Sequence, residues 1–150
     1  MLLRPFVKNT VLKNYRNHTS GGFKIKTPLG FTLGPIRTFL QYEVTNYTFD
    51  LHNYDNENVI SGFNRATIIN IDYSNLFRIG GKSVEKSILL GPTRSGDGNG
   101  FMTGMDIAFK IDATVPFYIS FFGRTNSIKN PVHGDMFWMT AGANLGVDIP

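Results

Sequence analysis

The chain has 150 residues and a formal net charge of +4, from 15 Lys and Arg against 11 Asp and Glu, and only 17% of its residues are charged. Aromatic residues reach 13%, which excludes a largely disordered chain because disordered segments are poor in aromatic side chains. The sequence holds no cysteine, so disulfide frameworks, zinc–cysteine sites and thiol catalysis are excluded. No apolar run approaches the roughly 20 residues of a membrane-spanning helix. Pro5, Lys8 and Asn9 interrupt any apolar region of a signal peptide.

Residues 1–21 form a basic N-terminal segment. Its first sixteen positions hold four basic residues and no acidic one: Arg4, Lys8, Lys13 and Arg16. Such an arm is typical of contact with nucleic acid or anionic lipid, and it is equally typical of a solvated terminus. Within this segment, residues 2–14 are also a candidate first strand.

Residues 22–150 are dominated by a hydrophobic period of two, which is typical of β-strands with one apolar face. In chain order, strands are expected over residues 23–33, 38–51, 66–73, 76–81, 104–112, 115–125 and 137–149. The apolar side chains of the second stretch change phase near Thr45 and Asn46, which predicts a β-bulge there.

The expected connections alternate in length. Short links are predicted at Gly34-Pro35, Ser74-Asn75 and Ala113-Thr114, and longer polar links over 52–64, 82–100 and 127–135. In an up-and-down antiparallel sheet, this alternation places all long loops at one end. With residues 2–14 as a first strand, the sheet has about eight strands.

With its alternating strands, its short turns LGPI and DATVP and its long loops rich in Gly, Asn and Asp, the chain resembles bacterial outer-membrane β-barrel proteins. The resemblance is one of architecture and covers most of residues 22–150. It implies an all-β, antiparallel up-and-down β-barrel of about eight strands, or part of a larger barrel, located in the bacterial outer membrane. The ending GVDIP, in place of the aromatic last residue usual in such barrels, suggests a piece of a larger barrel.

The second face of the strands carries small residues and isolated charges, which suit a narrow barrel interior. The charged residues of this face are the lumen-facing candidates: Lys24, Lys26, Glu43, Asp106, Lys110, Asp112, Arg124 and Asp148. They would either line a porin-like pore and tune its preference for ions, or pair with one another and plug the barrel. About eight strands favour the plugged state, and a larger barrel favours the pore. An interfacial aromatic belt would come from Tyr42, Tyr47, Phe101, Phe137 and Trp138.

No motif supports catalysis, and no cofactor or metal is expected. The stretch IGGKS lacks the first glycine of a phosphate-binding loop, and SGDGNG lacks the glutamate of a calcium-binding loop. Ser127, His133 and Asp135 are a hydrolase-type set only by their closeness in sequence, which provides no triad geometry.

We therefore expect a non-enzymatic outer-membrane protein that has a structural role or passes small solutes or ions, with outer-membrane lipid as its partner. The alternative is a soluble β-sandwich or jelly roll, a shell or binding protein whose basic arm, Arg4 to Arg16, contacts nucleic acid or a partner surface. A jelly roll needs long crossovers, so the regular alternation of short and long links favours the barrel.

Overall fold

The structure is a computed structural model, which describes residues 6–7, 21–53, 56–76, 84–111, 117–131 and 134–147. The described residues form one sheet, whose strands are β1 (Phe6–Val7), β2 (Gly22–Lys26), β3 (Thr32–Leu33), β4 (Ile36–Asn53), β5 (Asn56–Asp72), β6 (Val84–Ser95), β7 (Gly98–Ile111), β8 (Phe117–Asn130) and β9 (Gly134–Val147). Within these ranges, the chain contains no helix long and apolar enough to cross a membrane.

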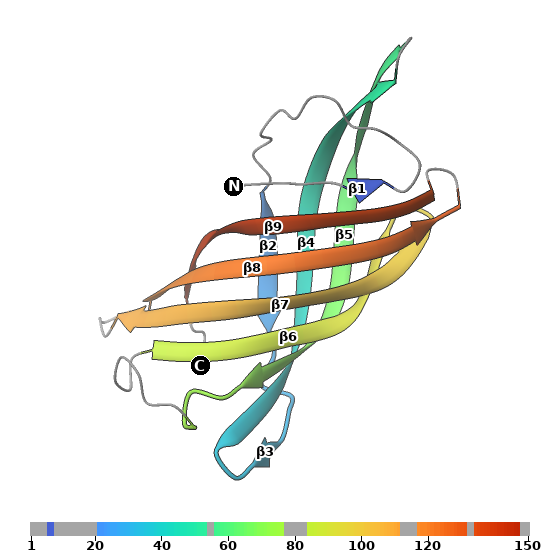
Figure 1. The fold of residues 1–150 in the computed structure, drawn as a ribbon. Coiled ribbons are helices and arrows are strands. Elements are labelled where there is room, and N and C mark those ends of the chain that lie inside the picture. The colour runs from blue at the N-terminus through green and yellow to red at the C-terminus, as the bar shows by residue number, and fades with distance from the viewer. Residues whose placement is uncertain are drawn as a thin grey trace.

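The sheet is antiparallel and up-and-down, which confirms the fold class expected from the sequence. Its strand order is β1-β9-β8-β7-β6-β5-β4-β2, with β3 paired to β4. Figure 1 shows β6, β7, β8 and β9 passing in front of β2, β4 and β5, so that the sheet curls into two facing walls. Among the described residues, β2 pairs with neither β1 nor β9, and the sheet is therefore curled but not closed.

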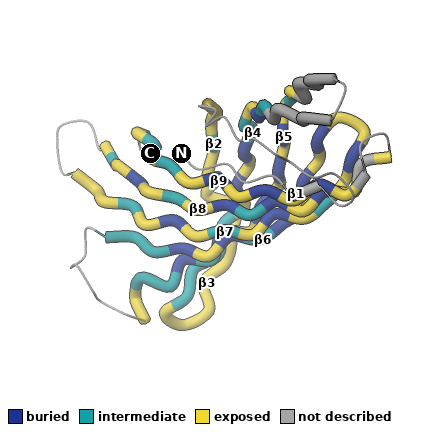
Figure 2. The backbone as a smooth tube through the Cα atoms, turned by 45° about the horizontal axis from the view of Figure 1, so that its top comes forward, coloured by how far each residue is buried: buried dark blue, intermediate teal, exposed yellow. Residues whose placement is uncertain are grey.

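The two faces of this sheet have opposite character. Buried and exposed positions alternate along the strands, as Figure 2 shows most clearly for β6 to β9. The outward positions of β7 include five exposed apolar side chains: Phe101, Met105, Ile107, Phe109 and Ile111. The buried polar residues, in contrast, include Gln41, Glu43, Asn64, Asn70, Asp72, Asp106, Arg124 and Asn126. This distribution is the reverse of that in a soluble domain, where charged side chains lie outside and apolar ones inside.

The alternation of short and long links predicted from the sequence is wrong. The segment 82–100 contains all of β6 and the start of β7, joined by a tight turn in which Gly96 has a φ of 54°. The segment 52–64 is part of a hairpin, because β4 and β5 remain paired out to Asn53 and Asn56. In the third segment, 127–135, β8 continues to Asn130 and β9 begins at Gly134. In β6, the inner face carries small and polar residues, among them Ser87, Gly91, Thr93 and Ser95, so its sequence looks like a loop.

The β-bulge predicted near Thr45 and Asn46 is also wrong. Pairing between β4 and β5 continues through both residues without an extra position. The hydrophobic phase changes because Tyr47 points into the interior, where its ring lies 5.5 Å from that of Trp138, centroid to centroid. An aromatic residue on the inner face thus gives the sequence a change of hydrophobic phase without a bulge in the strand.

Two further predicted strands fall partly on residues that the structure does not describe. Of the stretch 76–81, only Leu76 is described, and it belongs to a turn. Of the candidate first strand, residues 2–14, only Phe6 and Val7 are described, and they pair with Phe137 and Met136 of β9. The remainder of the basic segment up to residue 20 lies outside the described residues.

Inward aromatic rings lie against glycines of the neighbouring strand. The pairs, each made of direct cross-strand partners, are Tyr47 with Gly62, Phe122 with Gly142, and Tyr118 with Gly146. A β-carbon added to Gly142 would lie 2.9 Å from the Phe122 ring, closer than such contacts ordinarily allow. The missing side chain therefore gives the ring its place, as in the aromatic–glycine pairs used to fix strand register.

We predict that Gly142→Val lowers the free energy of unfolding by about 1–3 kcal/mol, because the new side chain would displace the Phe122 ring from the interior. The matched control is Gly123→Val on β8, where an added β-carbon meets nothing within 4 Å. This control should change stability by no more than about 0.5 kcal/mol. Urea unfolding of the two variants tests the pair, and equal losses would contradict the packing role of Gly142.

Candidate functional site

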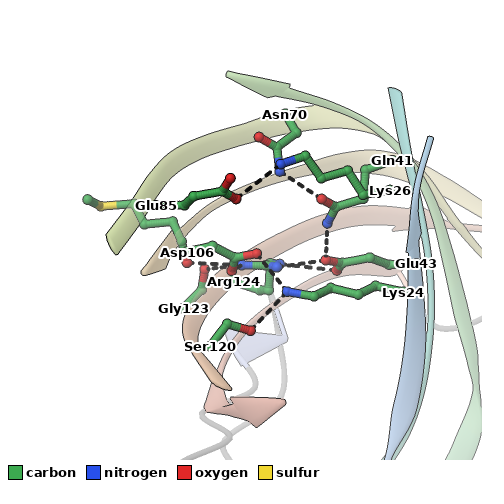
Figure 3. Close-up of polar contacts among 11 residues, drawn as sticks. Lys24, Lys26, Gln41, Glu43, Asn70, Glu85, Asp106, Ser120, Gly123 and Arg124 are labelled. Atoms are coloured by element: carbon green, nitrogen blue, oxygen red, sulfur yellow. Dashed lines mark hydrogen bonds and ion pairs between the residues drawn. The ribbon is translucent and has the colours of Figure 1, made fainter. Parts of the chain in front are cut away.

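The space between the two walls holds a network of ion pairs centred on Arg124 of β8, which is 5% exposed. Its guanidinium donates two hydrogen bonds to the carboxylate of Glu43 on β4, from Nη2 at 2.6 Å and from Nε at 3.1 Å. Its Nη1 donates to Oδ1 of Asp106 on β7 at 2.7 Å. Figure 3 shows these side chains meeting between the walls. One cation therefore joins a carboxylate of the facing wall to one of its own.

Lys24 of β2 adds a second cation to this network. Its Nζ donates to Oδ2 of Asp106 at 3.0 Å and to the Ser120 hydroxyl at 3.1 Å. Asp106 thus accepts from Arg124 through one oxygen and from Lys24 through the other. The two cations balance the two carboxylates, which is the condition under which charged groups tolerate burial. We call Lys24, Glu43, Asp106 and Arg124 the central network.

Two buried amides extend the central network along the wall formed by β4 and β5. Gln41 donates through Nε2 to Oε1 of Glu43 at 2.6 Å, and Asn70 donates through Nδ2 to Oε1 of Gln41 at 2.8 Å. Gln41 is 1% exposed and Asn70 is 3% exposed. The amides orient the Glu43 carboxylate toward Arg124, so the geometry of the ion pair is fixed from both sides.

A second cluster surrounds Glu85, close to the end of the walls where β5 and β6 are connected. Glu85 forms ion pairs with Lys110 at 3.1 Å, with Lys26 at 3.4 Å and with Arg37 at 3.8 Å. Arg37 also pairs with Asp72, whose carboxylate is nearly fully buried. The three cations are each about a third exposed, so solvent weakens these contacts relative to the central network.

Toward the opposite end, where the walls carry the β6–β7 turn, the interior changes from charged to neutral. Asn64 and Asn126 are joined by a hydrogen bond of 3.0 Å, and Thr93 donates to Asn64 at 2.7 Å. Beside these amides, buried apolar side chains form a layer that contains Ala66, Ile68, Leu89 and Met102. Side chains thus occupy both halves of the interior.

The structure brings six of the eight lumen-facing candidates into these two clusters. Lys24, Glu43, Asp106 and Arg124 make up the central network, whereas Lys26 and Lys110 lie in the cluster around Glu85. Asp112 and Asp148 lie outside the described residues.

Sequence reasoning missed several members of the clusters, above all Arg37, Gln41, Asp72 and Glu85. A signal existed for Arg37 and Gln41, because they share the odd-numbered face of β4 with Glu43. Glu85 gave no such signal, since its strand was not predicted.

The predicted aromatic belt divides into two groups. Tyr42, Phe101 and Phe137 are exposed on the outer face, as the prediction requires. Tyr47 and Trp138 are buried and their rings lie against each other, so the prediction is wrong for these two. Aromatic rings occur on both faces of the sheet. The alternation along each strand decides which face a ring occupies, as the exposed Phe137 and the buried Trp138 show.

The described residues hold no group of three His, Cys, Asp or Glu side chains that could bind a metal ion. Ser127 and Asp135 are exposed on the outer face, and His133 lies outside the described residues.

No family model matches the chain, and no curated protein or solved structure is significantly similar to it. Its function must therefore be argued from the arrangement of its residues.

We predict that Arg124→Gln lowers the free energy of unfolding by about 3–5 kcal/mol, because it leaves two buried carboxylates with too little positive charge. Lys129→Gln, on the exposed face of the same strand, removes the same charge and should cost no more than about 0.5 kcal/mol. Urea unfolding of both variants measures the difference. If the two substitutions cost the same, the central network does not hold the walls together.

Proposed function

We propose that this protein is a non-enzymatic β-barrel protein of the bacterial outer membrane, with its outer face in lipid and its interior closed by its own side chains. The observation that carries the proposal is the reversal of faces: paired charges lie inside the curled sheet, and large apolar side chains lie exposed outside it. A monomeric soluble protein rarely exposes an extended apolar face.

The exposed apolar face has a length that suits a bilayer. On β7 it runs from Phe101 to Ile111, and on β9 from Phe137 to Val147, ten residue steps in each case. At about 3.3 Å per residue, ten steps cover about 33 Å along the strand. Strands tilted by roughly 40° then give a band about 25 Å high, the height typical of outer-membrane barrels.

The band also has an edge of the expected kind. Phe101 and Phe137 are exposed and share one register row with Ser127 between them. The next outer-face row, two residues farther along the strands and away from the band, carries Asn99, Lys129 and Asp135, which are all exposed. Aromatic residues followed by polar ones are typical of the boundary between lipid chains and headgroups.

The interior favours a structural role over free passage of solutes. The central network is electrically balanced, and its cations and carboxylates contact one another across the space between the walls. An open pore would leave such charges to water and ions. The soluble β-sandwich or jelly roll with a basic arm gains no support from a sheet whose paired charges lie on the inner face.

We predict that the full chain, refolded into detergent micelles, migrates differently on SDS gels before and after boiling.

In vesicles, the fluorescence of Trp138, the single tryptophan, should be little quenched by brominated lipid chains because its ring is buried inside the sheet. Phe121→Trp, which places an indole on the outer face at a residue that is 55% exposed, should add a strongly quenched component. A folded, soluble protein in buffer without detergent would overturn the proposal.

A further inference from the structure

Three exposed basic residues stand in one register row of the outer face. Arg65 of β5 is the direct partner of Arg94 of β6, and the row continues through Asn99 of β7 to Lys129 of β8 and Asp135 of β9. All five side chains are exposed. Neighbouring strands lie about 4.8 Å apart, so the row is about 19 Å long. We call these five residues the basic row.

The two arginines of the basic row face each other without a carboxylate between them. Like charges at directly opposite positions of a sheet repel each other. Within the described residues, neither Arg65 nor Arg94 is engaged in an ion pair, and the Arg94 Nε donates to the Gly96 carbonyl at 3.2 Å. An anion bound between the two guanidinium groups would turn this repulsion into attraction.

The basic row lies directly beside the apolar band. The neighbouring outer-face row lies two residues away along the strands and consists of Pro92, Phe101, Ser127 and Phe137. Its rings on β7 and β9 are exposed. A molecule whose anionic group lies at the basic row can therefore pack an attached apolar tail on those rings. Free phosphate has no such tail, so the arrangement fits a lipid better.

We propose that the basic row binds the phosphate group of an anionic lipid headgroup, chiefly through Arg65 and Arg94. Guanidinium groups bind phosphate oxygens through paired hydrogen bonds. Lys129 adds a third positive charge, whereas Asp135 at the far end of the row repels the phosphate and directs it toward the arginines. This inference rests on the proposed function, because it requires the outer face to lie in lipid.

The test uses the full chain refolded into neutral detergent micelles that contain equal amounts of phosphatidylglycerol and phosphatidylcholine. Native mass spectrometry then counts the molecules of each lipid that remain bound. The wild-type protein should retain phosphatidylglycerol preferentially. Arg94→Gln should weaken that binding about fivefold, and Arg65→Gln with Arg94→Gln about 25-fold, as expected for cations at an anionic lipid surface.

Lys86→Gln is the matched control, since it removes the same charge from β6 at a position away from the basic row. It should leave the preference for phosphatidylglycerol unchanged. Equal losses from Arg94→Gln and Lys86→Gln would overturn the inference, because net charge alone would then explain binding.

Further results test the identity of the ligand and distinguish a failure of this inference from a failure of the proposed function. Displacement of phosphatidylglycerol by an equal concentration of inorganic phosphate would overturn the lipid as the ligand. A protein that shows the boiling-dependent gel shift but no preference for phosphatidylglycerol would overturn the inference and leave the proposed function standing. A protein that shows no gel shift would count against the proposed function itself.

Discussion

The contact of Arg124 with Glu43 and Asp106 is the interaction on which the rest of the structure depends. A buried charge is strongly unfavourable unless it is paired, so none of these three groups could occupy the interior alone. Arg124 and Asp106 belong to neighbouring strands of one wall, and Glu43 belongs to the facing wall. The walls must therefore stay close enough for a guanidinium to reach both carboxylates, and the curl of the sheet is tied to this distance.

Because the interior takes paired charges and polar side chains, the outer face of the sheet carries many of the large apolar ones. The strands alternate, so every inward polar position is followed by an outward one, and the outward positions of β7 and β9 are mostly apolar. Small inward residues complete the arrangement, because Gly142 gives space to the Phe122 ring, over which the Arg124 guanidinium lies at 5.1 Å. A polar, filled interior and an apolar exterior are what a lipid environment selects, which is why the proposed function follows from the faces rather than from a catalytic group.

The sequence predicted some strands well and missed others for an identifiable reason. The alternation around Met105 is regular, and β7 lies there as expected. In β6, the run Ile88, Leu89 and Leu90 breaks the period of two because Leu89 is a buried apolar residue on the otherwise polar inner face. Gly91 and Pro92 then add turn-like residues to a strand that is nevertheless paired along its length with β7. Glycine and proline are ordinary loop formers, yet here both stand inside a paired strand, with Gly91 buried on the inner face and Pro92 exposed on the outer one.

The sequence by itself determined which residues share a face, since alternation is a local property of the pleated strand. That local pattern was enough to assign four charged residues to one polar face: Lys24, Glu43, Asp106 and Arg124. It could not determine that Arg124 meets Glu43, 81 positions away, or that the ring of Tyr47 lies against that of Trp138. Those choices were made only by the tertiary structure, because the curl of the sheet and the register between strands decide which distant side chains lie within hydrogen-bonding distance.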